Sequence, residues 1–406
     1  MLSRLVRASG RDLVGALAGG ALAYSCSFYT DCPCANQPAN KTGGGAGMPS
    51  AGSGTTAGSG NEGAGGNGVG GSETPGGSGG EAGGGEVVQP GVWRPATGNL
   101  AGKSVACGNV NFMSVKPDEN LVIASVAKDG LYGSRDGGET WKPLGQNPKS
   151  ALIDNLPTAI LYDPADAARF WEVGIYGGPA VYRTDDNGDT FSVLGTVTHA
   201  DLLAIDWSDP KRRFMLLGAH EKAQALYRTD DGGDNWEDIG PNVPDTCKWS
   251  SFPVIVDADN WLLGCGSGIY GTSDAGQTWD LLSSFGGASV PLITSQGVIY
   301  WAIELSNGIA RSDDNGQTWE RVVGGGGIVS SLRPIELPDG SIATTNTNTV
   351  VRSTDDGRSW QPITAAASFT PAGLVYSEAE GAFFAWAQGC EKELPKDGIV
   401  RVDWAP

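Results

Sequence analysis

The chain has 406 residues, and its 46 acidic and 27 basic side chains give a formal net charge of −19 at pH 7. This excess of acid, without a cluster of Lys and Arg, excludes nucleic-acid binding, because phosphates need cations to neutralise them. No apolar run after residue 90 reaches the length of about 20 residues that a membrane-spanning helix requires, so the body holds no such helix.

The N-terminus has the composition of an export signal. Three arginines within the first 11 residues precede an apolar run over residues 13–23, which ends in small residues that fit a cleavage site. Residues 1–25 are therefore predicted to be a signal peptide, and the chain to be secreted or held at a bacterial cell surface. The sequence Ala23-Tyr24-Ser25-Cys26 resembles a lipobox, so lipidation of Cys26 would provide an outer-membrane anchor. Plain secretion remains the alternative.

Residues 26–90 are predicted to be a disordered linker. Between residues 41 and 90 there are 21 glycines and no aromatic side chain. Such a segment cannot bury enough apolar surface to offset the entropy of ordering it. The folded domain is therefore assigned to residues 91–406.

The body contains six copies of one phrase, Ser/Thr-x-Asp-x-Gly-x-Thr-Trp, which start at residues 134, 184, 229, 272, 312 and 353. Each copy lies between two apolar runs, so it is predicted to be a turn that joins two strands. Glycine supplies the positive φ of a tight turn, and the Asp carboxylate can accept backbone N–H groups within it. The six aspartates are Asp136, Asp186, Asp231, Asp274, Asp314 and Asp355, and the aromatic residues are Trp141, Phe191, Trp236, Trp279, Trp319 and Trp360.

The repeat predicts an all-β fold, a seven-bladed β-propeller of four-stranded blades. In the first unit the expected strands cover residues 110–115, 121–126, 130–133 and 141–144, with the phrase before the last one. The seventh unit lacks its phrase and fourth strand at the C-terminus. The segment Val92–Pro95 resembles that missing strand, so it should pair with Gly398–Val402 and close the ring. Trp93 should then be as buried as Trp141 and Trp360.

The six phrases resemble Asp boxes, also called BNR repeats, and the resemblance covers the body from Val92 to Pro406. Such boxes occur in sialidases, xyloglucan-hydrolysing propellers, the sortilin ectodomain, photosystem II assembly factors and proteins without known activity. The resemblance therefore implies the architecture and leaves the chemistry open.

The resemblance suggests two enzymatic alternatives. The early blades lack the Arg-Ile-Pro motif of a sialidase, and the recurring Arg183, Arg228, Arg311, Arg352 and Arg401 precede a box or its remnant, where they suit acidic turns. For a xyloglucan hydrolase, Asp129 is the nearest candidate aspartate, but its flanking residues match that family poorly. A glycoside hydrolase that uses carboxylates of the loop face stays as the alternative to a non-enzymatic binding propeller.

A binding site is expected on the face opposite the boxes, which carries the second-to-third-strand loops and the inter-blade connections. Loops on a rigid scaffold commonly carry binding residues. The candidate ligand-binding residues there are Tyr176, His199, Asp201, His220 and Trp249. Ordinary solvated loop positions are the alternative interpretation. The expected partner is a polysaccharide, a glycoprotein or another protein, bound by a monomeric chain.

The cysteines of the body suggest two disulfides. Four cysteines allow three pairings, and the expected blade geometry favours Cys247–Cys265 and Cys107–Cys390. The sequence has two histidines, 21 residues apart and without ligand-spaced neighbours, so no metal site is predicted. No cofactor motif is present either.

Overall fold

The computed structural model describes residues 91–105, 110–117, 119–127, 129–248, 250–287, 289–303, 308–322, 332–387 and 393–405. The predicted signal peptide, the lipidation site Cys26 and the linker lie outside these residues. Within them, none of the helices is long and apolar enough to cross a membrane.

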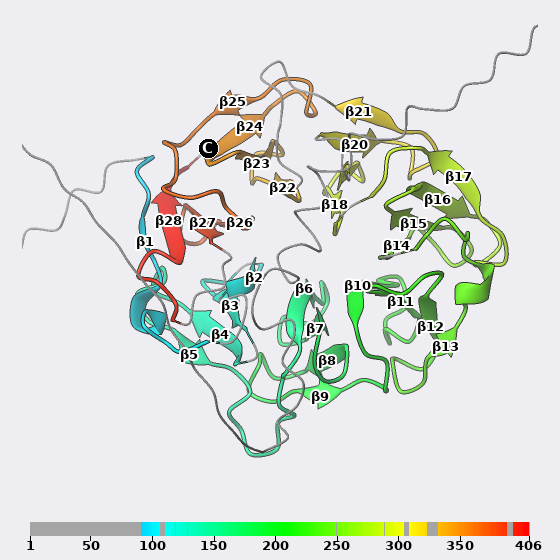
Figure 1. Cartoon of the computed structure of the whole chain (residues 1–406), viewed down its shortest axis with the longest axis horizontal. Helices are drawn as coiled ribbons and strands as arrows, with labels where there is room; N and C mark the ends of the chain where they lie inside the picture. The colour runs from blue at the N-terminus through cyan, green and yellow to red at the C-terminus, as the bar shows by residue number, and fades with distance from the viewer. Residues whose placement is uncertain are drawn as a thin grey trace, which may run out of the picture. The chain divides into compact units, whose positions relative to one another are not determined.

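The described residues form seven four-stranded antiparallel sheets arranged as a ring, which confirms the predicted seven-bladed propeller (Figure 1). In six blades the four strands follow one another along the chain, from the centre of the ring to its rim. Blade one consists of β2 (Val110–Val115), β3 (Val122–Val126), β4 (Gly130–Ser134) and β5 (Lys142–Pro143). Blade two consists of β6 (Leu156–Tyr162), β7 (Phe170–Ile175), β8 (Val181–Thr184) and β9 (Ser192–Val193). Blade three consists of β10 (Ala200–Ile205), β11 (Met215–Ala219), β12 (Leu226–Thr229) and β13 (Glu237–Asp238).

The next three blades repeat this order. Blade four consists of β14 (Phe252–Ile255), β15 (Trp261–Cys265), β16 (Gly268–Thr272) and β17 (Asp280–Ser283). Blade five consists of β18 (Leu292–Ile293), β19 (Ile299–Ala302), β20 (Ile309–Ser312) and β21 (Glu320–Val322). Blade six consists of β22 (Ile335–Glu336), β23 (Ile342–Asn346), β24 (Thr349–Ser353) and β25 (Gln361–Pro362). The described helical elements are two short 3-10 turns, η1 (Gly98–Leu100) and η2 (Gly240–Asn242).

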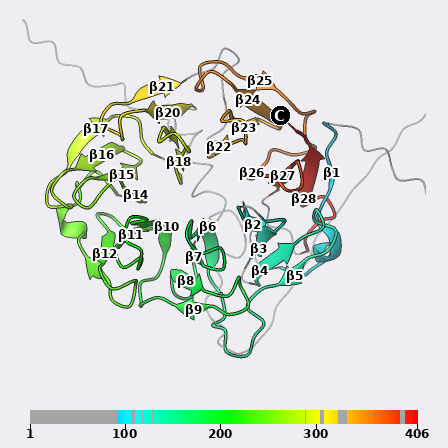
Figure 2. The same ribbon diagram turned by 180° about the vertical axis from the view of Figure 1, so that it is seen from behind.

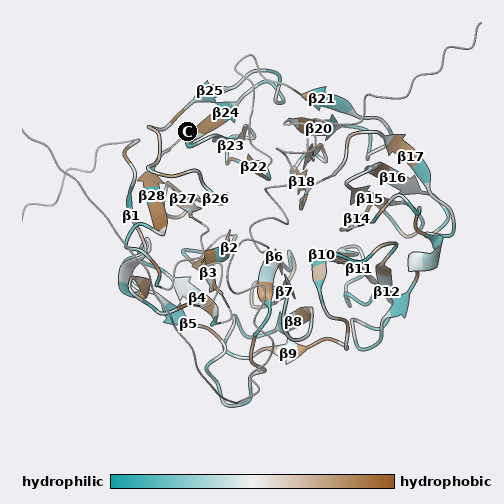
Figure 3. Cartoon of the chain, in the orientation of Figure 1, coloured by the Kyte–Doolittle hydropathy of each residue, from teal (hydrophilic) through white to brown (hydrophobic). Residues whose placement is uncertain are grey.

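Blade seven closes the ring with strands from both ends of the body (Figure 2). It consists of β26 (Gly373–Ser377), β27 (Ala382–Trp386), β28 (Ile399–Asp403) and the N-terminal strand β1 (Arg94–Pro95). Arg94 lies opposite Arg401 and Pro95 opposite Val400 in antiparallel register, which confirms the predicted closure. A ring closed in this way leaves only short outer strands as edges, and Figure 3 shows hydrophilic residues on β21 and β25 at that rim.

The core lies between neighbouring blades rather than in one central mass. Each box aromatic packs against the preceding blade: Trp141 between blades seven and one, Phe191 between one and two, and Trp360 between five and six. Trp93 occupies the corresponding position between blades six and seven. The expectation that Trp93 is fully buried is wrong, because its indole is half-exposed and donates a hydrogen bond to the Ala365 carbonyl at 2.8 Å.

The box turns have the predicted internal hydrogen bonds. In the first box, Asp136 Oδ1 accepts the Thr140 N–H at 2.9 Å, and the Ser134 hydroxyl accepts the Gly138 N–H at 2.9 Å. The Ser134 hydroxyl in turn donates to Asp136 at 2.9 Å. In later boxes these bonds lower the pKa of the carboxyl: bonds from Thr278 and Ser359 lower the pKa values of Asp274 and Asp355 to about 2. The box aspartates are therefore satisfied within their own turns.

Candidate functional site

The opposite ends of the strands bring together five polar or aromatic side chains on the loop face of blades two and three. Tyr176 directly follows β7, and His199 directly precedes β10, which contains Asp201. His220 and Glu221 follow β11. Tyr176, His199, Asp201, His220 and Glu221 are called the loop-face cluster from here on. Of the predicted site residues, Trp249 lies outside the described part of the chain.

A continuous chain of hydrogen bonds runs through this cluster. His220 Nδ1 lies 2.7 Å from Asp201 Oδ1, and His220 Nε2 lies 3.0 Å from the Tyr176 hydroxyl. The Tyr176 hydroxyl donates to Glu221 Oε1 at 2.8 Å. The Asp201 and His220 side chains are buried, whereas 39% of the Glu221 side chain is exposed. The chain therefore leads from a buried carboxylate to one that meets solvent.

The backbone at the cluster is strained. Tyr176, His199 and Glu221 have φ angles of 48°, 57° and 51°, in the left-handed region that residues with a side chain seldom adopt. In addition, the register of β10 against β11 shifts between Ala200 and Leu202, so Asp201 lies at a β-bulge. The first strands of blades one and two have the same kind of register shift, so the bulge is a feature of the repeat.

Aromatic rings and small apolar residues hold the cluster in place. The Tyr176 ring meets His220 and His199 edge to face, with ring centroids 5.1 Å and 5.5 Å apart. Tyr176 also packs against buried Ala127 and Leu156. The phenol ring is half-buried, so part of it is available at the surface.

The charges of the cluster are coupled. Burial lowers the pKa of His220, but the carboxylates of Asp201 and Glu221 raise it by more, so it lies above its usual value of 6.5. Burial also raises the pKa of Asp201, against the opposing effect of the His220 ring. The Asp201–His220 pair therefore titrates as one unit.

A disulfide joins the segment before blade four to the second strand of that blade. Cys247 is bonded to Cys265, with their Cα atoms 5.4 Å apart. The Cys247 carbonyl accepts the Gln224 N–H at 2.9 Å, which ties the loop after His220 to the loop before blade four. The predicted Cys107–Cys390 bond falls outside the described residues.

Other loop-face carboxylates are held by hydroxyl or ammonium groups. Asp129, the candidate from the xyloglucanase comparison, accepts the Tyr132 hydroxyl at 2.5 Å and pairs with Lys103 Nζ at 2.9 Å. Asp154 accepts the Tyr182 hydroxyl at 3.1 Å. Glu221 is the cluster member that the sequence did not single out, and its position directly after His220 was the available signal.

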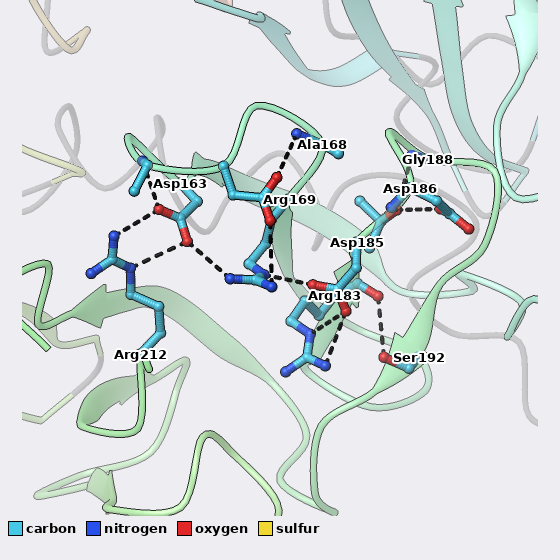
Figure 4. A network of polar contacts seen from close by, with 12 residues as sticks. Asp163, Ala168, Arg169, Arg183, Asp185, Asp186, Gly188, Ser192 and Arg212 are labelled. Carbon is cyan, nitrogen blue, oxygen red and sulfur yellow. Dashed lines mark hydrogen bonds and ion pairs between the residues drawn. The ribbon is translucent and has the colours of Figure 1, made fainter. Parts of the chain in front are cut away.

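The recurring arginines lie at the ends of the strands that carry the boxes, and they pair with acids there. Arg183 and Arg228 pair with Asp185 at 3.1 Å and Asp230 at 3.0 Å, respectively. Figure 4 shows that Arg169 extends this network by joining Asp185 to Asp163, which accepts a bidentate pair of bonds from Arg212. These arginines neutralise acidic turns. Within the described ranges, no group of three or more metal-ligating side chains is present.

Comparison with known proteins agrees with this architecture. The family model for the BNR/Asp-box repeat matches residues 310–321, which include the end of the fifth blade's third strand and its box. The chain therefore carries a BNR/Asp-box repeat within a ring of seven four-stranded sheets. No curated protein matches the sequence.

Solved structures share the fold at low sequence identity. The GH74 enzyme of Niastella koreensis is 16% identical, with 74% of this chain and 53% of that chain covered and a TM-score of 0.55. The extracellular domain of the putative hybrid two-component system BT4673 from B. thetaiotaomicron is 10% identical, with 76% and 40% covered and a TM-score of 0.52. An ancestral GH74 enzyme is 14% identical, with 72% and 45% covered and a TM-score of 0.50. The chain spans about half the length of the GH74 proteins, and the likeness shows the fold alone.

Proposed function

We propose that the chain is an extracytoplasmic, non-enzymatic propeller that binds a glycan or protein partner through the loop-face cluster. The observation that carries this proposal is the hydrogen-bonded chain from buried Asp201 to half-exposed Tyr176 and Glu221. Aromatic rings provide flat apolar contacts for a sugar or a partner side chain, and the adjacent polar groups provide directional hydrogen bonds.

The loop-face carboxylates are already bonded to other side chains, and this favours binding over hydrolysis. A glycosidase needs two carboxyl groups on opposite sides of the scissile bond, about 5 to 10 Å apart. Asp129, Asp154 and Asp201 are each bonded to another side chain of the protein. Hydrolysis by a loop-face carboxylate remains the competing proposal, and the GH74 fold likeness is its motivation.

One experiment separates the two proposals. The purified protein is incubated with immobilised neutral and acidic polysaccharides, and retention and newly formed reducing ends are scored together. Retention without reducing ends supports binding, and reducing ends that depend on a loop-face carboxylate support hydrolysis. Retention that survives in the Tyr176→Ala/Trp249→Ala variant would overturn the proposed site.

The expected loss in that double variant is large. Loss of the two side chains together should cost about 2 to 4 kcal/mol of binding free energy, at the magnitude of a hot spot, so retention should fall by at least about thirtyfold. Arg135→Ala and Gln277→Ala are the matched controls, because both residues belong to box turns on the other face. Both control variants should bind like the parent protein.

The extracytoplasmic location rests on the N-terminal sequence. The arginine-rich start, the apolar run and Cys26 support export and lipid anchoring, and the likeness to an extracellular domain is compatible with them. Cell fractionation tests both export and lipid anchoring. The parent protein should appear in the membrane fraction, and Cys26→Ala should move it to the soluble extracytoplasmic fraction.

A further inference from the structure

A buried carboxyl group on β7 lies beside a carboxamide, and each of the two groups has one oxygen without a partner. The Glu172 side chain is fully buried, and its Oε2 accepts a hydrogen bond from Asn155 Nδ2 at 3.2 Å. Glu172 Oε1 and Asn155 Oδ1 are also buried, and neither has a hydrogen-bond partner within the described part of the chain. Buried polar atoms without a partner are costly, so these two oxygens need an explanation.

The orientation of the Asn155 amide is fixed by its second hydrogen bond. Asn155 Nδ2 also donates to the Pro179 carbonyl at 3.1 Å. Because a carbonyl can only accept, the nitrogen must face Pro179, and both of its protons are used. Asn155 Oδ1 is therefore an acceptor that lacks a donor.

A proton on Glu172 Oε1 would supply that donor. A protonated carboxyl group has one donor and one acceptor, as a carboxamide has, so the two groups can pair reciprocally. Burial raises the pKa of Glu172 well above 4.5, and in the described part of the chain the bond from Asn155 is the one opposing influence. Ionisation would also add a second negative charge close to Tyr182, whose hydroxyl is bonded to the Asp154 carboxylate. The neutral form is therefore favoured.

The equivalent positions of three other blades are apolar. Glu172 lies opposite Tyr182 of the neighbouring strand β8. The residues opposite the matching tyrosines Tyr132, Tyr227 and Tyr270 are Ala124, Leu217 and Leu263, and all three are buried. An apolar side chain is thus sufficient for the interior of a blade, so the carboxyl group of Glu172 has a role that the fold itself does not require.

Asn155 holds the loop that joins β7 to β8, which begins at Tyr176. A Cβ atom at Gly174 would lie 2.6 Å from Asn155 Cγ, and a Cβ atom at Gly177 would lie 2.8 Å from Asn155 Cα. Glycine is required at both positions because the backbone approaches Asn155 so closely. Together with the hydrogen bond to Pro179, this packing fixes the β7–β8 loop against Asn155.

We propose that Glu172 is a neutral carboxylic acid that donates a hydrogen bond to Asn155 Oδ1, and that this acid–amide pair positions the β7–β8 loop, and with it Tyr176, for ligand binding. Glu172 is then a positioning residue, which acts through Asn155 and does not touch the ligand. The effect on binding rests on the proposed function of the loop face, whereas the protonation of Glu172 does not depend on any ligand.

Protonation is tested by ¹³C NMR of the whole protein with glutamate labelled at Cδ. The signal that disappears in Glu172→Gln is assigned to Glu172. At pH 7 this signal should have the chemical shift of a protonated carboxyl group. The chemical shift of a carboxylate at pH 7 would overturn the proposal.

The hold of the pair on the loop is tested by hydrogen exchange at Ala180, whose N–H donates to the Val197 carbonyl. In Glu172→Met, which cannot bond to Asn155, this amide should exchange about tenfold faster, as expected for the loss of one hydrogen bond. Glu172→Gln should keep the parent rate, because two amides also pair reciprocally. Leu217→Met, the matched change in blade three, should keep it too. Equal rates in Glu172→Met and the parent, or equally fast exchange in both Glu172 variants, would overturn the positioning role.

The effect on binding is tested with the immobilised neutral and acidic polysaccharides. Retention should fall about tenfold in Glu172→Met and return to the parent level in Glu172→Gln. Parent-like retention of Glu172→Met despite faster exchange at Ala180 would show that the loop position does not affect binding, and would overturn that part of the proposal. If no polysaccharide retains the parent protein, the proposed glycan binding fails, while NMR and hydrogen exchange still decide the protonation of Glu172 and its effect on the loop.

Discussion

The two ends of the same strands satisfy their carboxylates in different ways. On the box face, Asp136 and its five counterparts bond mainly to residues two to four positions away, inside one turn. On the loop face, Asp201 bonds to a residue 19 positions away, and Tyr176 bonds to residues 44 and 45 positions away. The box turns can therefore repeat six times, because each one carries its own partners. The loop-face cluster occurs at one junction and depends on two blades.

This difference explains why the repeated motif does not locate the function. A carboxylate that is fully bonded within its turn has little free energy to gain from a ligand. The hydrogen-bonded chain of the loop-face cluster ends in a half-exposed phenol and a half-exposed carboxylate, which a ligand can contact. We therefore expect changes at the boxes to affect folding, and changes at the cluster to affect binding.

Truncation of a box aromatic should have the largest effect on stability. Trp141 is 2% exposed and fills the space between blades seven and one, so Trp141→Ala should lower the free energy of unfolding by about 3 to 5 kcal/mol. Urea unfolding measures this loss. Trp93→Ala, at the half-exposed equivalent position, should cost less. Equal losses for the two variants would contradict the burial assigned to them.

The Asp163–Arg212 ion pair links blades two and three on the box face. It tests whether this face also depends on contacts between residues that are far apart in the sequence. Asp163 and Arg212 are both buried and form a bidentate ion pair (Figure 4). Asp163→Ala leaves the buried Arg212 guanidinium without this counter-charge, although it keeps its hydrogen bonds to the Trp207 and Asp209 carbonyls, and should cost about 3 kcal/mol. Adding Arg212→Ala should restore part of this stability. If the second change makes the protein less stable still, the unpaired cation was not the cause.

The pairing of Asp201 with His220 should appear as a coupling energy. In a double-mutant cycle of Asp201→Ala and His220→Ala, we expect a coupling of about 1 to 3 kcal/mol by urea unfolding at pH 6. The same cycle on Asp136 and Thr140 should give a smaller coupling, because that turn is exposed to solvent. A larger coupling in the box would invert the comparison between the two faces.

Substitution of Glu172 should have the smallest effect on the free energy of unfolding, and this effect should depend on pH. This β7 side chain is fully buried, and burial raises its pKa well above 4.5 despite a hydrogen bond from Asn155. A carboxyl whose folded pKa is raised stabilises the fold below its unfolded pKa, and this contribution is lost as the pH rises through the folded value. Glu172→Gln should therefore remove the loss, with a gain of about 1 kcal/mol at alkaline pH.

Unfolding curves at several pH values provide the measurement for Glu172. The parent protein should lose stability toward alkaline pH, while the Gln variant should change less. Parallel curves for the two proteins would show that Glu172 does not titrate in this range. Asp274 provides the opposite sign for comparison: its pKa is lowered to about 2, so its contribution is lost only as the pH falls from about 4 toward that value.

The sequence by itself determined the ring. Six regularly spaced turns, each flanked by apolar runs, define the strands and their order, because the information lies within single repeats of 40 to 50 residues. The likeness of Val92–Pro95 to a fourth strand also predicted the closure, since an equivalent strand exists in every other blade. The half-exposure of Trp93 was not predictable, because it depends on the blade packed against it.

The tertiary structure alone decided how the loop-face residues meet. The sequence placed Tyr176, His199, Asp201 and His220 on one face, but only the packing of blade two against blade three brings them into one hydrogen-bonded chain. The left-handed backbone at Tyr176 and Glu221 has no motif in the sequence. It persists because the surrounding structure restrains the backbone in conformations that no local preference would choose.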